Sequence, residues 1–188
     1  MDQRLAVLVS GSGTLLDAIV EGNIPISLVI ADRPCAGLEK AKACGIETIL
    51  VERTFGDSFD RKQYTKQILE ILLEREITFV SMAGWMTIFT QSIFDWYTDQ
   101  IINNHPSLLP SFPGDSAVAD ALAYGVMISG CTIHVATVEV DNGPIIAQAA
   151  VPVYTDDTEE KLHERIKVAE RMLLVAVLRK LLGIVPGI

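Results

Sequence analysis

Short apolar runs alternate with helical segments through the first half of the chain, and this alternation limits the fold most strongly. The runs cover residues 5–9, 26–31, 47–51 and 77–83. The segments between them cover residues 14–21, 37–44 and 60–76, the last with apolar residues at helical spacing. Continuous apolar runs are typical of strands buried in a parallel sheet. Strands that alternate with helices predict a doubly wound α/β sheet with right-handed crossovers.

The pattern changes after residue 90. We predict helices at 91–97 and 117–124, strands at 100–103, 129–138 and 144–153, and one long helix at 157–182. A short turn at 141–143 separates the last two strands, which makes them antiparallel. Together these segments predict a single α/β domain over residues 1–188, with a mostly parallel sheet, antiparallel C-terminal strands and a long C-terminal helix.

Composition narrows the class of protein. A chain of 188 residues with 49% hydrophobic content can bury one substantial core. The net charge of −9 argues against a nucleic-acid partner. No apolar run is long enough to span a membrane, and no secretory signal opens the chain, so we expect a cytoplasmic location. An odd number of cysteines without a C-x-x-C pair predicts reduced thiols.

Asn103 and His105 stand at the end of a predicted strand, just before Pro106, which stops the strand because proline cannot donate to a ladder. Side chains alternate along a strand, so Asn103 and His105 point to one side and Asn104 to the other. Ligands bind at the carboxyl ends of the strands in open α/β sheets. An amide and an imidazole there, joined by the later carboxylate of Asp141, suit acyl transfer with an oxyanion donor, a proton shuttle and a tuning group.

Other interpretations of these residues stay open from the sequence. Asp141 could serve only its own turn, and spacing cannot show that it meets His105. His134 lies mid-strand and is expected to be a satisfied, half-buried residue that supports a nearby site. His163 lies among charged residues and is expected on the surface. Three histidines without an H-x-x-x-H pair predict no metal site.

A glycine turn, Ser10-Gly11-Ser12-Gly13-Thr14, follows the first strand and opens a helix, where backbone N–H groups can hold a phosphate. It is neither a Walker A loop nor a full dinucleotide fingerprint, since Leu16 takes the place of the third glycine. Asp32, at the end of the second strand, leaves ribose binding open. A purely structural turn is the alternative.

Several motifs, in this order and spacing, resemble the phosphoribosylglycinamide formyltransferases, the folate-dependent GAR transformylases. The motifs are Ser10-Gly-Ser-Gly-Thr14, Ala83-Gly-Trp-Met86, Asn103-x-His-Pro-Ser-Leu-Leu-Pro-Ser-Phe-Pro-Gly114, Asp120-Ala-Leu-Ala-Tyr-Gly125, Gly130-Cys-Thr-Ile-His134, Asp141-x-Gly-Pro-Ile-Ile-Ala-Gln148 and Leu162-His-Glu-Arg-Ile-Lys167. The resemblance implies a Rossmann-like formyltransferase fold, with a phosphate-binding half at about 1–100 and a catalytic and folate-binding half at about 101–188. It implies transfer of the formyl group of 10-formyltetrahydrofolate to the amine of N1-(5-phosphoribosyl)glycinamide in de novo purine (IMP) biosynthesis.

The resemblance also implies roles for individual residues. Asn103 would donate to the formyl oxygen, His105 would be the general acid, and Asp141 would raise its pKa and order water. The residues implied for the phosphoribosylglycinamide site are Gly13, Thr14, Leu15, Leu16, Asp17, Lys167, Val168, Ala169 and Glu170. The residues implied for the folate site are Arg61, Met86, Thr87, Ile88, Phe89, Asn103, Thr137, Val138, Glu139, Val140 and Asp141. The partners are small molecules, with folate as a co-substrate, no metal, and a homodimer as an open assembly.

The resemblance extends to relatives with other activities, which share the formyl-transfer fold. Methionyl-tRNA formyltransferases usually have Gly where Pro106 stands, and carry a tRNA-binding domain. Formyltetrahydrofolate deformylases, sugar N-formyltransferases and a non-catalytic folate or nucleotide binder are the alternatives. Thr87 stands where the family usually has Arg, Ser116 where it often has His, Ala119 where Arg is common, and Leu15 where Asn is frequent, so the pocket departs from the family pattern while Asn103, His105 and Asp141 are kept.

Overall fold

The computed structural model describes residues 3–54, 56 and 59–184, so both ends of the predicted domain, residues 1–2 and 185–188, lie outside the described residues. The elements follow in the order β1 (Leu5–Val9), α1 (Thr14–Glu21), β2 (Leu28–Ala31), α2 (Ala36–Ala43), β3 (Thr48–Leu50), α3 (Arg61–Glu74), β4 (Phe79–Met82), α4 (Gln91–Trp96), β5 (Ile101–His105), α5 (Ala117–Tyr124), β6 (Ile128–Val135), β7 (Ile145–Pro152) and α6 (Glu159–Leu181). The strands form one seven-stranded sheet in the order β3-β2-β1-β4-β5-β6-β7. This confirms the predicted fold class.

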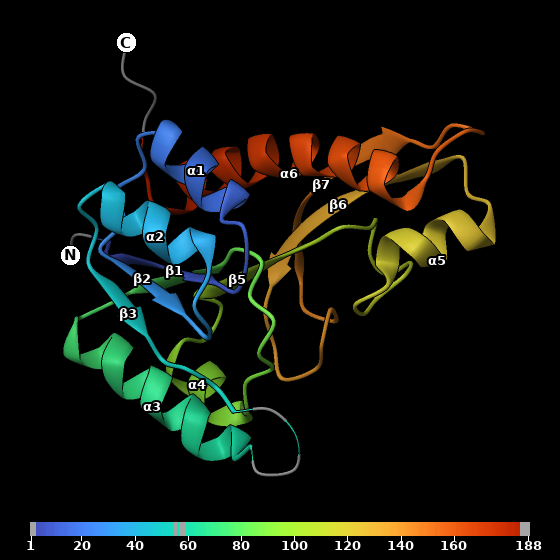
Figure 1. The fold of residues 1–188 in the computed structure, drawn as a ribbon. Coiled ribbons are helices and arrows are strands. Elements are labelled where there is room, and N and C mark those ends of the chain that lie inside the picture. Colours follow the sequence, from blue (N-terminus) through green and yellow to red (C-terminus); the bar gives the residue numbers. More distant parts are fainter. Residues whose placement is uncertain (1–2, 55, 57–58, 185–188) are drawn as a thin grey trace. The chain divides into compact units, whose positions relative to one another are not determined.

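Two compact units divide the chain, residues 1–102 and residues 103–188. In the first unit, β1 pairs in parallel with both β2 and β4, and β2 pairs in parallel with β3. Every residue of β1 and β2 is buried, as their continuous apolar sequences predict. Within this unit, α1 and α2 lie on one face of the strands and α3 lies on the other (Figure 1). The doubly wound pattern follows from this placement.

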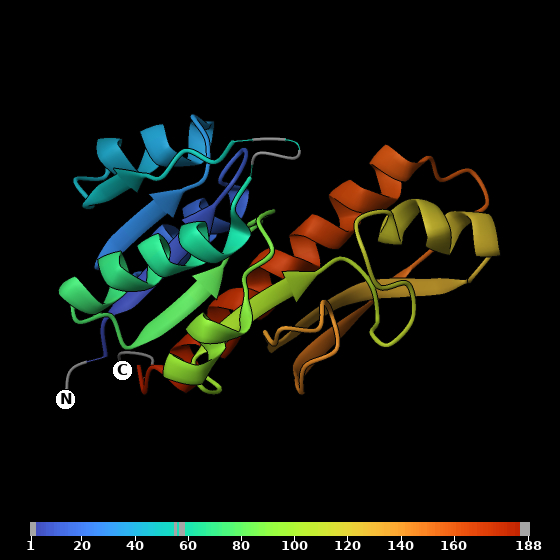
Figure 2. The same ribbon diagram turned by 90° about the horizontal axis from the view of Figure 1, so that it is seen from below.

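The second unit is built on the antiparallel pair β6 and β7, with α5 and α6 packed beside it (Figure 2). Its core gathers apolar side chains from all four elements and the segment between β7 and α6. The buried members are Val118, Cys131, Val151, Val153, Leu162 and Ile166. Thr158 caps α6 by accepting from the N–H of Lys161, and Glu159 and Glu160 lie in its first turn, which suits the helix dipole.

Two predicted boundaries differ in ways that affect the site. β5 continues through His105 and not just to Asn103, because Pro106 is the first residue that cannot join the ladder. β6 ends at Val135, three residues before the predicted Val138. Beyond it the hydroxyl of Thr137 donates to the carbonyl oxygen of Glu139, which folds the chain into a turn that continues to Asp141.

Candidate active site

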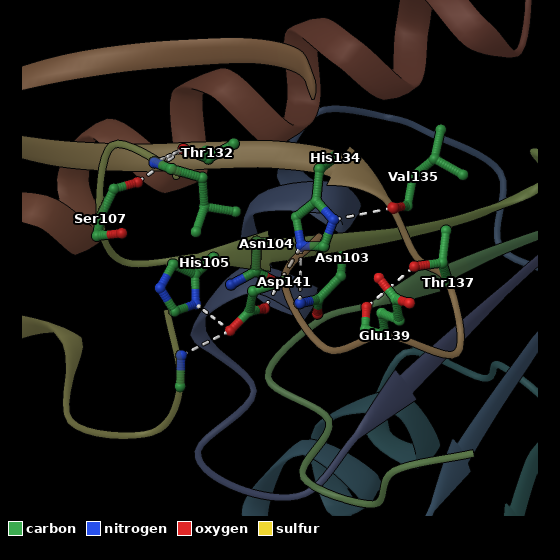
Figure 3. Close-up of polar contacts among 12 residues, drawn as sticks. Asn103, Asn104, His105, Ser107, Thr132, His134, Val135, Thr137, Glu139 and Asp141 are labelled. Carbon is green, nitrogen blue, oxygen red and sulfur yellow. Dashed lines mark hydrogen bonds and ion pairs between the residues drawn. The ribbon is translucent and has the colours of Figure 1, made fainter. Parts of the chain in front are cut away.

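β5 presents its side chains in two directions within the second unit. Asn103 and His105 both reach a cluster around Asp141, whereas Asn104 turns away and donates to Glu170 on α6. Figure 3 shows His105, Asp141, Asn103 and His134 gathered in this cluster. The alternation predicted from the sequence is therefore what the structure has.

His105 and Asp141 are in direct contact. Nδ1 of His105 lies 3.3 Å from Oδ2 of Asp141, and both side chains are almost fully buried. Nε2 of His105 lies 2.8 Å from the carbonyl oxygen of Phe112. Because a carbonyl oxygen can only accept, this contact places a proton on Nε2. A second proton on Nδ1 would turn the Asp141 contact into an imidazolium–carboxylate pair.

Asp141 is held from several sides. It has a φ of 54°, a left-handed conformation that Asp tolerates better than most residues, and this turns its carboxylate toward β5 and β6. The backbone N–H of Gly114 donates to Oδ2 at 2.8 Å. Burial alone would raise the pKa of this carboxyl, but the nearby imidazole of His134, the hydrogen bond from Gly114 and the charge of His105 outweigh it and hold the pKa below its ordinary value. Asp141 is therefore an anion beside His105.

His134, which the sequence suggested only as a supporting residue, is a member of this cluster. Its Nδ1 lies 2.9 Å from the carbonyl oxygen of Val135, which places a proton on Nδ1. Its Nε2 lies 3.3 Å from Nδ2 of Asn103 and 3.6 Å from Oδ1 of Asp141. In the neutral ring Nε2 accepts one N–H of Asn103, and the amide keeps its second N–H for a ligand. The same-face alternation of Thr132 and His134 along the strand was the only sequence signal for this contact.

The glycine turn in the first unit lies close to the backbone of Gly37. Gly13 has a φ of 71°, and a Cβ there would meet the Cα of Gly37 at 2.5 Å, so the position excludes a side chain. The hydroxyl of Ser10 accepts from the N–H of Met86, which fixes the end of β1 against the segment after β4. Leu15 and Leu16, both predicted as phosphate contacts, have buried side chains. Only their backbone N–H groups at the start of α1 can contact a ligand.

Asp32 is fully buried, and this removes the support for its ribose-binding interpretation. Its carboxylate takes two hydrogen bonds from Arg33, at 2.9 and 3.1 Å, and one at 2.7 Å from the hydroxyl of Thr87. Burial works to raise the pKa of the Asp32 carboxyl, but hydrogen bonds from Arg33, Thr87 and Ser10 hold it below its ordinary value. Thr87, predicted to line the folate pocket, therefore points its hydroxyl inward to Asp32.

The remaining residues that were predicted to bind folate differ in exposure. In the first unit Met86 and Ile88 are exposed, Phe89 is buried, and Arg61 is exposed at the start of α3. In the second unit the turn that leads to Asp141 exposes Val138, Glu139 and Val140, while Thr137 is half-buried.

The predicted substrate residues of α6 also differ from one another. Glu170 is buried, Lys167 pairs with Glu164 at 2.7 Å, Val168 is exposed, and Ala169 packs toward the core of the second unit. His163, expected on the surface, is half-buried on the same helix, and burial lowers the pKa of its imidazole.

Two further observations concern residues 3–54, 56 and 59–184. In that part of the chain no three His, Cys, Asp or Glu side chains come together in a group that could hold a metal ion. Across the same residues, no helix combines the length and the apolar character needed to cross a membrane.

Comparison with known proteins identifies the family. A family model described as formyl transferase matches residues 3–178. The phosphoribosylglycinamide formyltransferase of Mycobacterium tuberculosis (strain ATCC 25618 / H37Rv) is 40% identical over 183 residues, covering 95% of this chain and 84% of that protein. That of Bacillus subtilis (strain 168) is 36% identical over 190 residues, covering 97% and 96%. The crystal structure of glycinamide ribonucleotide transformylase 1 from Symbiobacterium toebii aligns with a TM-score of 0.90 at 37% identity, covering 98% of this chain and 91% of that one. The chain therefore belongs to the formyl transferase family, among the phosphoribosylglycinamide formyltransferases, as its motifs predict.

Proposed function

We propose that this enzyme transfers the formyl group of 10-formyltetrahydrofolate to the amine of N1-(5-phosphoribosyl)glycinamide, giving the N-formyl product and tetrahydrofolate. The observation that carries the proposal is the cluster in which the almost fully buried side chains of His105 and Asp141 meet and the half-buried Asn103 contacts His134, in a chain of this family. The cluster offers a hydrogen-bond donor, an acid and an anion within one site. These are the groups that acyl transfer to an amine requires.

The amine nitrogen attacks the formyl carbon directly, so no nucleophilic Ser or Cys is needed. As the tetrahedral intermediate forms, the second N–H of Asn103 donates to the developing oxyanion. The bond from the formyl carbon to N10 of the folate then breaks. His105 gives its proton to N10, and water ordered by Asp141 takes the proton that the amine loses and returns it to His105. Asp141 stabilises the imidazolium that His105 must become before it can act.

The acceptor substrate would bind through two segments. The turn at Gly13–Asp17 would hold its phosphate with backbone N–H groups, because a left-handed glycine and a helix N-terminus favour an anion. The segment Lys167–Glu170 would contact its sugar, with Glu170 accepting from ribose hydroxyls.

The formyl folate would bind through Arg61, the segment Met86–Phe89 and the segment Thr137–Asp141. Since the hydroxyl of Thr87 is committed to Asp32, we propose that residue 87 contributes only its backbone to the folate. The chain would act as a single catalytic domain on small-molecule substrates in the cytoplasm.

The direct test is to mix the protein with 10-formyltetrahydrofolate and phosphoribosylglycinamide and to follow the absorbance change of folate deformylation. We expect deformylation that depends on the acceptor. Deformylation at the same rate without acceptor would identify a deformylase. Folate binding without turnover, unchanged in His105→Ala, would identify a non-catalytic binder.

A further inference from the structure

Asn104 makes a contact that the proposed chemistry does not use. It lies between Asn103 and His105 in β5, and its side chain points the opposite way. Its Nδ2 donates to Oε1 of Glu170 at 2.9 Å. The bond joins the strand that carries the reacting groups to α6, within the second unit.

Glu170 is an unusual acceptor. It is only 4% exposed, and burial raises the pKa of its carboxyl, against the lowering effects of the Asn104 hydrogen bond and of the Lys167 and Arg171 charges. In the described part of the chain neither cation comes within ion-pair distance of it. The amide of Asn104 is the one hydrogen-bond donor found for this carboxyl among those residues. Its orientation therefore depends on Asn104.

Asn104 is itself incompletely satisfied. Its Oδ1 is buried and has no hydrogen-bond partner among the described residues. A buried acceptor without a partner costs stability, and a buried carboxyl held by one neutral donor costs more. An apolar pair at these two positions would avoid both costs. A residue pair that lowers the stability of the folded protein in this way points to a role in ligand binding.

We propose that Asn104 is a positioning residue for the acceptor substrate: it holds the Glu170 carboxyl in the orientation that accepts the hydroxyls of a phosphorylated sugar. The inference rests on the proposed role of Glu170 in binding that sugar. Because Asn104 belongs to the same strand as Asn103 and His105, the contact also sets where the sugar lies relative to the reacting groups. Its effect falls on the acceptor and not on the folate.

The test compares Asn104→Leu, Asn104→Ala, Glu170→Gln and the double variant Asn104→Leu/Glu170→Gln. Binding of phosphoribosylglycinamide and of 10-formyltetrahydrofolate is measured by calorimetry, which needs no turnover. Gln148→Leu is the control, because Gln148 is an exposed residue of β7 in the same unit whose amide donates to the carbonyl oxygen of Leu109 and to the hydroxyl of Thr132. Asn104→Ala is included in case Asn104→Leu fails to fold, because the smaller alanine side chain leaves room for water.

We expect Asn104→Leu or Asn104→Ala to raise the Kd for the acceptor about tenfold, with the folate Kd within about twofold of the unchanged protein. The double variant should bind the acceptor no more than about twofold worse than Glu170→Gln, because the two residues act as one unit. In Gln148→Leu both Kd values should stay within about twofold.

Three results would overturn the inference: acceptor binding unchanged in both Asn104 variants, equal weakening of both ligands, or fully additive effects in the double variant. Unchanged acceptor binding in Glu170→Gln would overturn it as well. Failure of the unchanged protein to bind or formylate the acceptor would instead contradict the proposed function, so the two failures are distinguishable.

Discussion

Nδ1 of His105 and the backbone N–H of Gly114 meet the same oxygen of Asp141, at 3.3 and 2.8 Å. The other oxygen of that carboxylate lies 3.6 Å from His134. One anion therefore organises two imidazoles and a loop. The acid function proposed for His105 would therefore depend on a residue 36 positions later in the sequence (141 − 105).

Removal of either member of the His105–Asp141 pair should reduce formyl transfer strongly. We expect His105→Ala and Asp141→Asn each to lose about 10²–10⁴ in kcat, the usual scale for general acid–base catalysis. Steady-state kinetics with both substrates saturating measures this, and thermal unfolding shows that each variant is folded. Near-normal turnover in both variants is incompatible with the mechanism.

His134 should matter less than His105, because in the proposed mechanism His134 orients groups and does not exchange a proton with the substrates. We expect His134→Gln to lower kcat about 10- to 100-fold, because the Asn103 amide and one oxygen of Asp141 lose the imidazole that orients them. His163→Gln, on α6, is the control and should stay near full activity. A loss in His134→Gln as large as that in His105→Ala would require a direct chemical role for His134.

Low pH should lower the stability of the second unit, because protonation of Asp157 removes its ion pair with Arg165. Arg165 donates to both oxygens of Asp157, at 2.7 and 2.8 Å, and this pair lowers the pKa of the carboxyl to about 2. The folded pKa lies below the unfolded value of about 3.9, so the stabilisation is complete above that pH and is lost as the pH falls toward 2. Urea unfolding of the unchanged protein and of Arg165→Met should show a gap that closes between about pH 4 and pH 2. A gap independent of pH would show that the ion pair is not its cause.

Thr87 should contribute to stability. Its hydroxyl donates to a fully buried carboxylate at 2.7 Å, and a hydrogen bond to a charged group contributes more than a neutral one. We expect Thr87→Val to lower the free energy of unfolding by about 1–3 kcal/mol. Thr98→Val, which removes an exposed hydroxyl bonded to the carbonyl oxygen of Phe94, should change it by less than about 0.5 kcal/mol. If both substitutions lower the free energy of unfolding equally, the hydrogen bond from Thr87 to Asp32 does not stabilise the fold as proposed.

The fold was largely predictable because its signals are local. The ranges predicted for β1, α1 and α5 match the observed ones, since each combines an apolar pattern with a glycine beside it. Strand ends were less predictable. The early end of β6 depends on a hydroxyl-to-backbone bond at Thr137 that no periodic pattern reveals.

The site was predictable in part. Alternation along β5 placed Asn103 with His105, but the meeting of His105 and Asp141 depends on how β5, β6 and the turn before β7 come together in space. The contacts of His134 and Asn104 were hidden for the same reason, because their partners are 31 and 66 residues away in the sequence. The inward turn of Thr87 depends on Asp32, 55 residues earlier. Long-range contacts of this kind have no signature in spacing.

The most direct test of the central claim follows the formyl group itself. Formyl-¹³C-labelled 10-formyltetrahydrofolate is mixed with phosphoribosylglycinamide and the enzyme, and the label is traced by NMR. We expect every labelled formyl group lost from the folate to appear on the glycinamide nitrogen, and we expect His105→Ala to slow its appearance. Label found as free formate, or transfer that His105→Ala leaves unchanged, would contradict it.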